Sequence, residues 1–271
     1  MNKKETYLIA VDMDGTVFHN LLEYDVKSTE ILKKLKKDHK VIIATGRPFR
    51  SSDFYYDIIG LDTPIINYNG ALIQNKNDEN FKKVLITISK EHLIEFINKT
   101  RHHLKNIFCE IEDDIFCLYE TEHIMPHLHL DGGKAYFGEM TEILNSDPHG
   151  ALVFLNSDCR EELVKYVDET FNGSLKIRFW YSQEEIIGEL YNPNITKGNA
   201  IKHVAEYYNI DQNHIITFGD GQNDIEMLQY AKYGVAMGNS SDYVKSCANY
   251  VTISIYENGV YEFLSKFFNI E

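Results

Sequence analysis

The order of apolar and polar residues predicts a strand-and-helix alternation at the start of the chain. Residues 7–11 are apolar throughout, which is typical of a strand in a parallel sheet covered on both faces. Residues 28–37 have the amphipathic pattern of a helix, with Ser28 or Thr29 as its N-cap. Two further apolar runs predict strands at 41–44 and 64–67. This alternation indicates an α/β domain built on a parallel sheet.

The same alternation returns in the last third of the chain. It predicts a helix over 197–208, a strand over 214–218, a turn at 219–221, a helix over 224–231, and strands over 233–236 and 250–252. Together with the opening segment, this pattern predicts one Rossmann-like parallel sheet that both ends of the chain form.

The middle of the chain has a different pattern, with strands that outnumber helices. Strands are predicted at 84–88, 107–111, 115–119, 151–155, 175–180 and 186–191, and helices at 90–103 and 158–171. We therefore predict an independent α+β unit over 83–188, inserted into a core formed by 1–82 and 189–271.

Composition and charge narrow the classes of partner. The chain has 271 residues, with 27 Lys and Arg against 41 Asp and Glu, which gives a net charge of −14. Nucleic acids and anionic membranes require a broad basic surface, so neither is expected as the main partner. Apolar residues make up 44% of the chain, which supplies a substantial core and excludes wholesale disorder.

The cysteines and the apolar runs indicate a soluble cytoplasmic protein. The four cysteines lie far apart and form no CxxC pair, so neither a disulfide framework nor a zinc ribbon is indicated. The first apolar run ends at Asp12, which is too short for the core of a signal peptide. No stretch approaches the roughly 18 apolar residues of a membrane span.

Two acidic residues follow the first predicted strand, in the sequence Asp12-Met13-Asp14-Gly15-Thr16. Side chains at positions i and i+2 of an extended segment share a face, and strand ends are where open α/β sheets bind ligands. Such a pair can bind a hard cation and divide the roles of nucleophile and proton donor. A calcium-binding EF-hand is excluded, because its sixth position must be Gly and here is Val17. A plain polar turn remains an alternative.

Three other segments carry residues of matching chemistry. Thr45 and its turn follow the second strand, and their hydroxyl and amides are suited to phosphate oxygens, although a simple turn also accounts for them. Asp220 and Asp224 follow the strand at 214–218 and would complete an oxygen-rich magnesium site. An N-cap role explains Asp224 but not Asp220. Lys197 opens a helix, and it is either a surface charge or the cation that holds these carboxylates and an anionic substrate together.

These segments together resemble the four motifs of haloacid dehalogenase-like phosphatases. The matching residues, in order, are Asp12-x-Asp14-Gly-Thr, Thr45-Gly-Arg, Lys197-Gly198 and Gly219-Asp220-Gly-x-Asn223-Asp224. Asn69-Gly70-Ala71 and the segment from Gly234 to Asn239 are similar to the Cof-type subgroup, in which a cap is inserted between the second and third motifs. The resemblance implies the haloacid dehalogenase fold with an inserted α+β cap of the C2 type, which acts as a lid over the substrate.

The resemblance also implies a mechanism and a set of site residues. Asp12 would attack phosphorus, Asp14 would act as acid and then base, and Thr45 and Lys197 would hold the phosphoryl oxygens. Mg²⁺ would be bound by the Asp12 carboxylate, the Asp14 carbonyl and Asp220, with support from Asp224. Further phosphate-binding residues implied by the resemblance are Gly15, Gly46, Arg47, Asn69 and Asn223. The expected substrate is a small phosphorylated metabolite, and the expected assembly is a monomer or a weak homo-oligomer.

Other interpretations stay open at this point. A phosphotransferase or mutase would use the same residues, and a phosphoaspartate signalling module or a sugar-phosphate sensor shares part of them. Asp14 favours turnover, because a signalling module has no acid–base carboxylate at that position. A sugar phosphate, a nucleotide or a phosphorylated cofactor fits as substrate. His123, His127, His129 and Asp131 lie close in sequence, and they form a second metal site, a segment that selects substrate, or an exposed loop.

Overall fold

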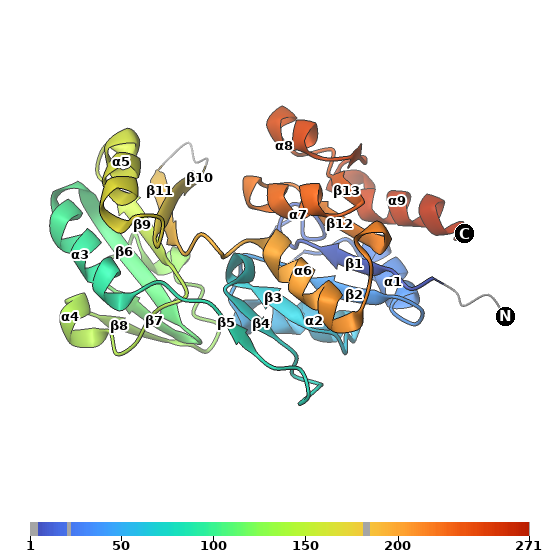
Figure 1. Cartoon of the computed structure of the whole chain (residues 1–271), viewed down its shortest axis with the longest axis horizontal. Helices are drawn as coiled ribbons and strands as arrows, with labels where there is room; N and C mark the ends of the chain where they lie inside the picture. Colours follow the sequence, from blue (N-terminus) through green and yellow to red (C-terminus); the bar gives the residue numbers. More distant parts are fainter. Residues whose placement is uncertain (1–4, 21–22, 181–184, 271) are drawn as a thin grey trace. The chain divides into compact units, whose positions relative to one another are not determined.

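The structure, a computed structural model, describes residues 5–20, 23–180 and 185–270. The chain forms two compact units (Figure 1). The first contains Met1–Arg47, Ser52–Val84 and Thr196–Glu271, and the second contains Pro48–Ser51 and Leu85–Ile195. The predicted boundary at 188/189 lies inside a strand that pairs with the second unit, so the change of unit occurs instead at 195/196.

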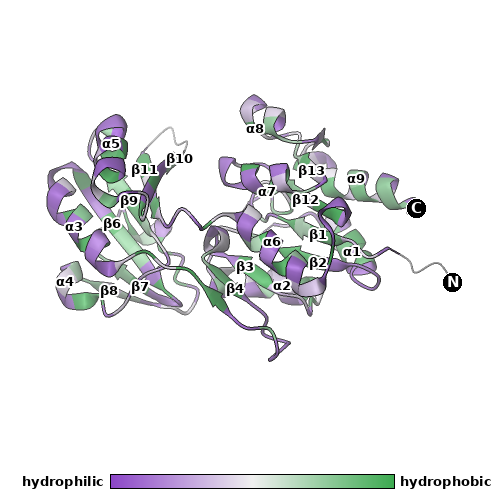
Figure 2. Cartoon of the chain, in the orientation of Figure 1, coloured by the Kyte–Doolittle hydropathy of each residue, from purple (hydrophilic) through white to green (hydrophobic). Residues whose placement is uncertain are grey.

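The first unit is built on a five-stranded sheet in which all neighbouring strands are parallel. Its strand order is β14 (Tyr250–Val251), β13 (Tyr233–Ala236), β12 (Ile215–Gly219), β1 (Leu8–Val11) and β2 (Lys40–Ile43). The central strand β1 is fully buried, as its continuous apolar sequence predicts. Figure 2 shows hydrophobic residues along these strands.

Helices cover both faces of this sheet. α6 (Lys197–Tyr208) and α7 (Ile225–Tyr230) pack on the face that carries Leu8, Ala10 and Ile42. On β12, Thr217 donates a hydrogen bond to the Met227 carbonyl of α7, whereas the next residue, Phe218, contacts Phe263 of α9 (Gly259–Phe268). Because successive strand residues point to opposite faces, α9 lies on the face opposite α7. α1 (Val26–Leu35) packs beside α9.

Smaller elements complete the first unit. β3 (Ile65–Asn67), β4 (Leu72–Gln74) and β5 (Val84–Leu85) form a separate sheet, and the change from the first unit to the second falls inside β5. An isolated parallel bridge joins Ile66 of β3 to Ala44 after β2. The strand predicted at 84–88 is therefore shorter than expected and pairs outside the second unit. The remaining helices are η1 (Phe49–Ser51, which clusters with the second unit), α2 (Asp53–Ile59), η2 (Tyr68–Gly70), η5 (Gln212–His214), η6 (Gln222–Asp224), α8 (Asp242–Cys247) and η7 (Ile255–Glu257).

The second unit is a six-stranded sheet whose α-helices α3 (Lys90–Thr100), α4 (Met140–Ile143) and α5 (Arg160–Phe171) pack on one face. The strand order is β10 (Lys176–Trp180), β11 (Ile186–Tyr191), β9 (Ala151–Leu155), β6 (Leu104–Ile111), β7 (Asp114–Cys117) and β8 (Lys134–Phe137). All pairs are antiparallel except β7 with β8. The core between the sheet and its helices includes residues of α3, α4 and α5. η3 (Arg101–His103) extends α3, and η4 (Met125–His127) lies in the β7–β8 connection.

The first helix begins earlier than the sequence pattern predicts. Its N-cap is Asp25, whose carboxylate accepts a hydrogen bond from the Ser28 amide at 3.2 Å. Ser28 and Thr29, the predicted caps, lie inside the helix and are buried. The Thr29 hydroxyl donates to the Asp25 carbonyl at 2.7 Å. A serine or threonine inside a helix can satisfy its hydroxyl in this way, so the residue type alone does not locate the cap.

Candidate active site

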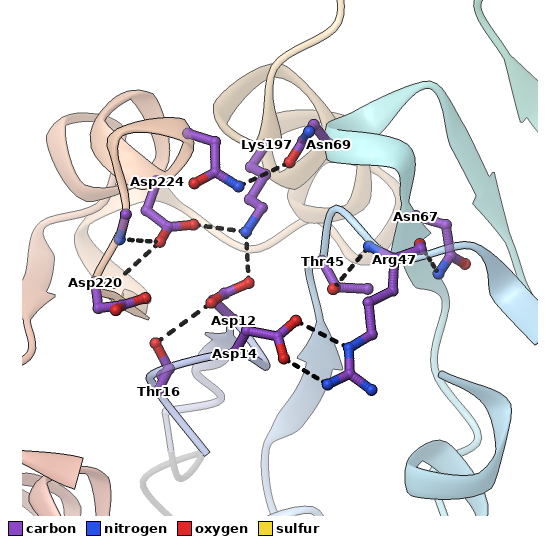
Figure 3. A network of polar contacts seen from close by, with 12 residues as sticks. Asp12, Asp14, Thr16, Thr45, Arg47, Asn67, Asn69, Lys197, Asp220 and Asp224 are labelled. Carbon is purple, nitrogen blue, oxygen red and sulfur yellow. Dashed lines mark hydrogen bonds and ion pairs between the residues drawn. The ribbon is translucent and has the colours of Figure 1, made fainter. Parts of the chain in front are cut away.

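The predicted site residues gather at the carboxyl end of the parallel sheet of the first unit (Figure 3). Asp12 directly follows β1, Thr45 follows β2 by two residues, and Asp220 directly follows β12. These are three neighbouring strands. Because they are parallel, their carboxyl ends meet at one edge of the sheet, where α/β proteins bind ligands.

A buried lysine joins two of the carboxylates. The Lys197 ammonium lies 2.6 Å from Asp12 Oδ1 and 2.6 Å from Asp224 Oδ1, and the Lys197 side chain is 0% exposed. Burial alone would lower the pKa of Lys197, but the charges of Asp12 and Asp224 and its hydrogen bonds to them raise that pKa above its usual range. The sequence left open whether Lys197 is a surface charge, and the structure excludes that reading.

The start of α6 sets the position of Lys197. Thr196 is the N-cap, and its hydroxyl accepts a hydrogen bond from the Asn199 amide at 3.0 Å. At Gly198 a Cβ atom would lie 2.8 Å from the Glu226 carbonyl oxygen, so the glycine allows α6 to approach α7 closely. Lys197 is the first residue of α6, and this packing places it between Asp12 after β1 and Asp224 after β12.

The loop after β12 holds Asp224 from two sides. Asp224 Oδ2 accepts hydrogen bonds from the amides of Asp220 (3.0 Å) and Gly221 (2.9 Å), while its other oxygen binds Lys197. A Cβ atom at Gly219 would lie 2.5 Å from Asp224, so a larger residue would disturb this arrangement. Both oxygens of Asp224 are engaged by the protein, which makes it a residue that orders the loop and Lys197.

The loop after β1 places Asp220 against the backbone of Gly15. Gly15 has φ = +72°, a conformation that favours glycine. A Cβ atom there would lie 2.1 Å from Asp220 Oδ2. Asp12, at the start of this loop, accepts a hydrogen bond from the Thr16 hydroxyl at 3.5 Å. The positive φ of Gly15 and the lack of space for a Cβ atom explain why glycine stands between the acidic pair and Thr16.

Arg47 binds Asp14 rather than standing apart from the carboxylates. Its Nε donates to Asp14 Oδ2 at 2.9 Å, and one terminal guanidinium nitrogen donates to Asp14 Oδ1. The Asp14 side chain is 52% exposed and that of Arg47 is 11% exposed. The guanidinium also lies over the Phe18 ring, 5.1 Å from its centroid. A two-point contact of this kind fixes orientation as well as charge, so Arg47 orients the Asp14 carboxylate in this structure.

Thr45, Asn69 and Asn223 form a connected polar group beside these carboxylates. Thr45 is fully buried, and its hydroxyl accepts a hydrogen bond from the Arg47 amide at 3.1 Å. The Asn69 amide donates to the Thr45 carbonyl at 3.0 Å, and the Asn223 side chain donates to Asn69 Oδ1 at 2.9 Å. A Cβ atom at Gly46 would lie 3.2 Å from Asn69. The predicted residues Gly46, Asn69 and Asn223 therefore hold the turn that presents Thr45.

Two further residues belong to the site and were not assigned from the sequence. Thr16 contacts Asp12, as described above. Asn239 donates from its side chain to the Gly15 carbonyl at 2.8 Å and to Asp220 Oδ2 at 3.3 Å. Both lie within segments that resemble the family motifs, and this resemblance could have identified them as site residues. Their partners could not be read from the sequence.

The carboxylates suit a hard divalent cation. One oxygen from each of Asp12, Asp220 and Asp224 lies within 4.8 Å of the others. Burial, followed by the charge of Asp224, raises the pKa of Asp12 well above its usual range and that of Asp220 to about 7. Burial is the largest cause of both shifts. Within the described residues, the three carboxylates also face only one ammonium, that of Lys197, so the formal charge of the group is negative. An all-oxygen donor set with negative charge is the environment that hard divalent cations prefer.

Of the four residues His123, His127, His129 and Asp131, only the two histidines His123 and His127 share a partner within the described part of the chain. His123 and His127 both contact Glu185 in the second unit. The His129 carbonyl instead accepts a hydrogen bond from Arg50 at 3.1 Å, and the Asp131 carboxylate accepts one from Ser51. The third member of the group is therefore Glu185, which the sequence did not suggest because it lies far along the chain.

Comparison with known proteins places the chain in a family. A family model of haloacid dehalogenase-like hydrolases matches residues 9–264. The chain belongs to this family. The 5-amino-6-(5-phospho-D-ribitylamino)uracil phosphatase YitU of Bacillus subtilis is 30% identical over 266 residues, which are 97% of this chain and 98% of that protein.

Solved structures agree with this assignment. A haloacid dehalogenase-like hydrolase from Bacteroides thetaiotaomicron has a TM-score of 0.81 at 22% identity, over 97% of this chain and all of that one. A sugar phosphatase of haloacid dehalogenase subclass IIB has a TM-score of 0.78 at 25% identity, over 98% of this chain and all of that one. The family, the α/β fold with its additional unit and the activity of a phosphomonoesterase, all expected from the motifs, are confirmed. In the described segments, no helix has the length and apolar character needed to cross a membrane.

The buried ion pairs of Lys197 generate a prediction about stability. Replacing Lys197 with Met leaves Asp12 and Asp224 facing each other without their cation. Removing one partner of a buried pair costs about 3–5 kcal/mol. We therefore expect Lys197→Met to lower the free energy of unfolding by that amount, measured with urea in EDTA.

The matched control for this prediction is Lys202→Met on the same helix, where the side chain is exposed. It should change the free energy of unfolding by no more than about 0.5 kcal/mol. Equal stabilities of the two variants would show that the Lys197 ion pairs do not stabilise the metal-free site.

Proposed function

We propose that the chain is a magnesium-dependent phosphatase that hydrolyses a small phosphorylated metabolite through an aspartyl-phosphate on Asp12. The observation that carries the proposal is the arrangement of Asp12, which Lys197 holds at 2.6 Å, with the half-exposed Asp14 two residues later. One carboxylate is buried and fixed, and the other is accessible. This difference fits a division of labour between nucleophile and proton donor.

In the first step, an Asp12 carboxylate oxygen attacks phosphorus and the bond from phosphorus to the ester oxygen breaks. Asp14 gives its proton to the departing ester oxygen, so an alcohol leaves and the phosphoryl group is carried on Asp12. The Lys197 ammonium and the Thr45 hydroxyl, which still has its own proton to donate, would stabilise the phosphoryl oxygens. Arg47 would hold Asp14 in the orientation required for the transfer.

In the second step, water attacks the phosphorus of the aspartyl-phosphate. Asp14, now a carboxylate, takes a proton from this water as the bond to Asp12 breaks. Inorganic phosphate is released and the Asp12 carboxylate is restored. The same residue thus acts as acid and then as base, so both steps depend on the accessibility of Asp14.

Mg²⁺ would be held by the Asp12 and Asp220 carboxylates and the Asp14 carbonyl. When bound, it neutralises charge on the phosphoryl oxygens, which is the main requirement of phosphoryl transfer. Asp224 would act indirectly, because its two oxygens bind Lys197 and the backbone amides of the loop. Asn239, which contacts both Gly15 and Asp220, would keep the two ligand-bearing loops together.

We further propose a sugar or polyol phosphate as the substrate class, with the second unit selecting the part of the substrate that carries no phosphate. The support comes from relatives, since one is a phosphatase of a phosphoribitylamino compound and another is a sugar phosphatase. The net charge of −14 fits a small substrate better than a nucleic acid or an anionic membrane lipid.

A panel of phosphate esters tests this substrate class. The panel would contain sugar phosphates, polyol phosphates including 5-amino-6-(5-phospho-D-ribitylamino)uracil, nucleoside monophosphates and phosphorylated cofactors, with excess Mg²⁺ and detection of released phosphate. We expect kcat/KM to be highest for a sugar or polyol phosphate. A nucleoside monophosphate as the preferred substrate would contradict the class but not the phosphatase activity.

Metal dependence is a separate prediction. EDTA should abolish hydrolysis, and excess Mg²⁺ should restore it, whereas Ca²⁺ should restore little. Ca²⁺ is larger and takes a looser shell of ligands, so it would align Asp12 poorly with phosphorus. Equal rates with the two ions, measured after complete removal of EDTA, would contradict a site that requires octahedral geometry.

Replacing Asp14 with Asn tests its acid–base role. Hydrolysis of an alkyl phosphate should fall by about 10²–10⁴-fold, the usual contribution of a positioned acid or base. Hydrolysis of an activated aryl phosphate should fall much less in its first step, because the leaving oxygen needs no proton. Phosphorylated protein should then accumulate, detected as a gain of one phosphoryl mass on the intact chain.

The control is the double variant Asp12→Asn with Asp14→Asn, which should accumulate no phosphoprotein. Asparagine at position 14 keeps one oxygen that accepts from Arg47, whereas its amide nitrogen cannot accept the second hydrogen bond. Equal mild losses with both esters and no trapped phosphoprotein would remove Asp14 from acid–base chemistry.

A further inference from the structure

Two histidines and one glutamate of the second unit direct their metal-binding atoms toward one point. His123 Nε2 contacts Glu185 Oε1, and His127 Nε2 lies 3.3 Å from Glu185 Oε2. One ligand atom from each residue lies within 4.8 Å of the others. His123 and His127 come from the β7–β8 connection, and Glu185 directly precedes β11.

The two imidazoles are held on one side of a helical turn. Ile124 and Leu128, which stand next to the histidines in sequence, are buried in the core under this segment. The His127 ring lies 4.8 Å from the Phe154 ring and the His123 ring 5.6 Å from it, measured between centroids. Phe154 therefore supports both rings from one side.

An ordinary ion pair does not require this arrangement. Lys105 already places its ammonium 2.9 Å from Glu185 Oε1, which provides the carboxylate with a cation. In addition, one imidazole nitrogen lies beside each oxygen of the Glu185 carboxylate. Their side chains and that of Glu185 are partly exposed, between 19% and 33%, so an ion in solution can reach them.

We propose that His123, His127 and Glu185 form a second divalent-metal site, which takes a borderline ion such as Zn²⁺. Two imidazole nitrogens and one carboxylate are a common protein ligand set for Zn²⁺, with water in the fourth position. The donor set differs from the carboxylates at Asp12 and Asp220, which suit Mg²⁺. The bound ion would link the β7–β8 connection to the residue before β11 and stabilise the second unit. This proposal does not depend on the phosphatase mechanism.

Zinc titration of the metal-stripped full chain tests the site. Excess Mg²⁺ is kept in the buffer to occupy the carboxylates near Asp12, and a chromophoric chelator competes for Zn²⁺. We expect the wild-type chain to take up one Zn²⁺ and to melt at a higher temperature with Zn²⁺ than without it. His123→Gln and His127→Gln should each weaken binding by more than the roughly 10–100-fold that loss of a supporting residue costs, and should lose the thermal shift.

His103 offers a matched control, because its Nε2 lies 3.3 Å from Glu162 Oε1. Together with His102, these two residues form another group of close metal-binding atoms. His103→Gln removes an imidazole beside a glutamate while leaving the proposed site intact, so it should bind Zn²⁺ like the wild type. Lys105→Gln should tighten binding, because it removes the cation that competes for Glu185.

Folding of each variant is checked by circular dichroism, and Co²⁺ serves as a spectroscopic probe. Co²⁺ bound by the wild type should give the visible absorption of a nitrogen- and oxygen-ligated ion, and this band should be lost in His127→Gln. No zinc uptake by the wild type would overturn the proposal. Uptake that persists in both His123→Gln and His127→Gln would also overturn it.

Discussion

The burial of one ammonium group between two carboxylates organises the site. Lys197 is fully enclosed and binds Asp12 and Asp224 at equal distances of 2.6 Å. A charge in such a place is tolerated only when it is paired and hydrogen-bonded. Asp12 belongs to the first motif and Asp224 to the last, so this contact holds together loops from opposite ends of the chain. The N-cap at Thr196 and the close approach of α6 and α7 at Gly198 support that contact.

The charge balance around Lys197 has a consequence for the chemistry. The single ammonium of Lys197 faces the three carboxylates of Asp12, Asp220 and Asp224. Burial, followed by the charge of Asp224, raises the pKa values of Asp12 and Asp220. A divalent cation bound beside these carboxylates would offset the remaining negative charge. Arg47 is committed to Asp14, so the remaining excess of negative charge is concentrated where Asp12 and Asp220 meet.

The fold and the acidic residues were largely predictable, because they depend on local patterns. Continuous apolar runs identify the buried strands, and parallel pairing then brings Asp12, Thr45 and Asp220 to one edge. α9 was not predicted, although its apolar residues recur with helical spacing. Neither α2 nor the β3–β4 pair was predicted. Nor did the pattern predict that Arg47 binds Asp14 or that Glu185 joins His123 and His127. These contacts connect residues tens of positions apart, and their geometry follows from tertiary structure.

The stereochemistry of phosphoryl transfer distinguishes an aspartyl-phosphate on Asp12 from direct attack by water on the substrate. The measurement uses a substrate made chiral at phosphorus with oxygen isotopes and determines the configuration of the product when an added alcohol replaces water as acceptor. Transfer through an aspartyl-phosphate on Asp12 requires two in-line displacements, each of which inverts the configuration at phosphorus. Net retention is therefore expected. Net inversion would show a single direct displacement and would contradict the role of Asp12 as nucleophile.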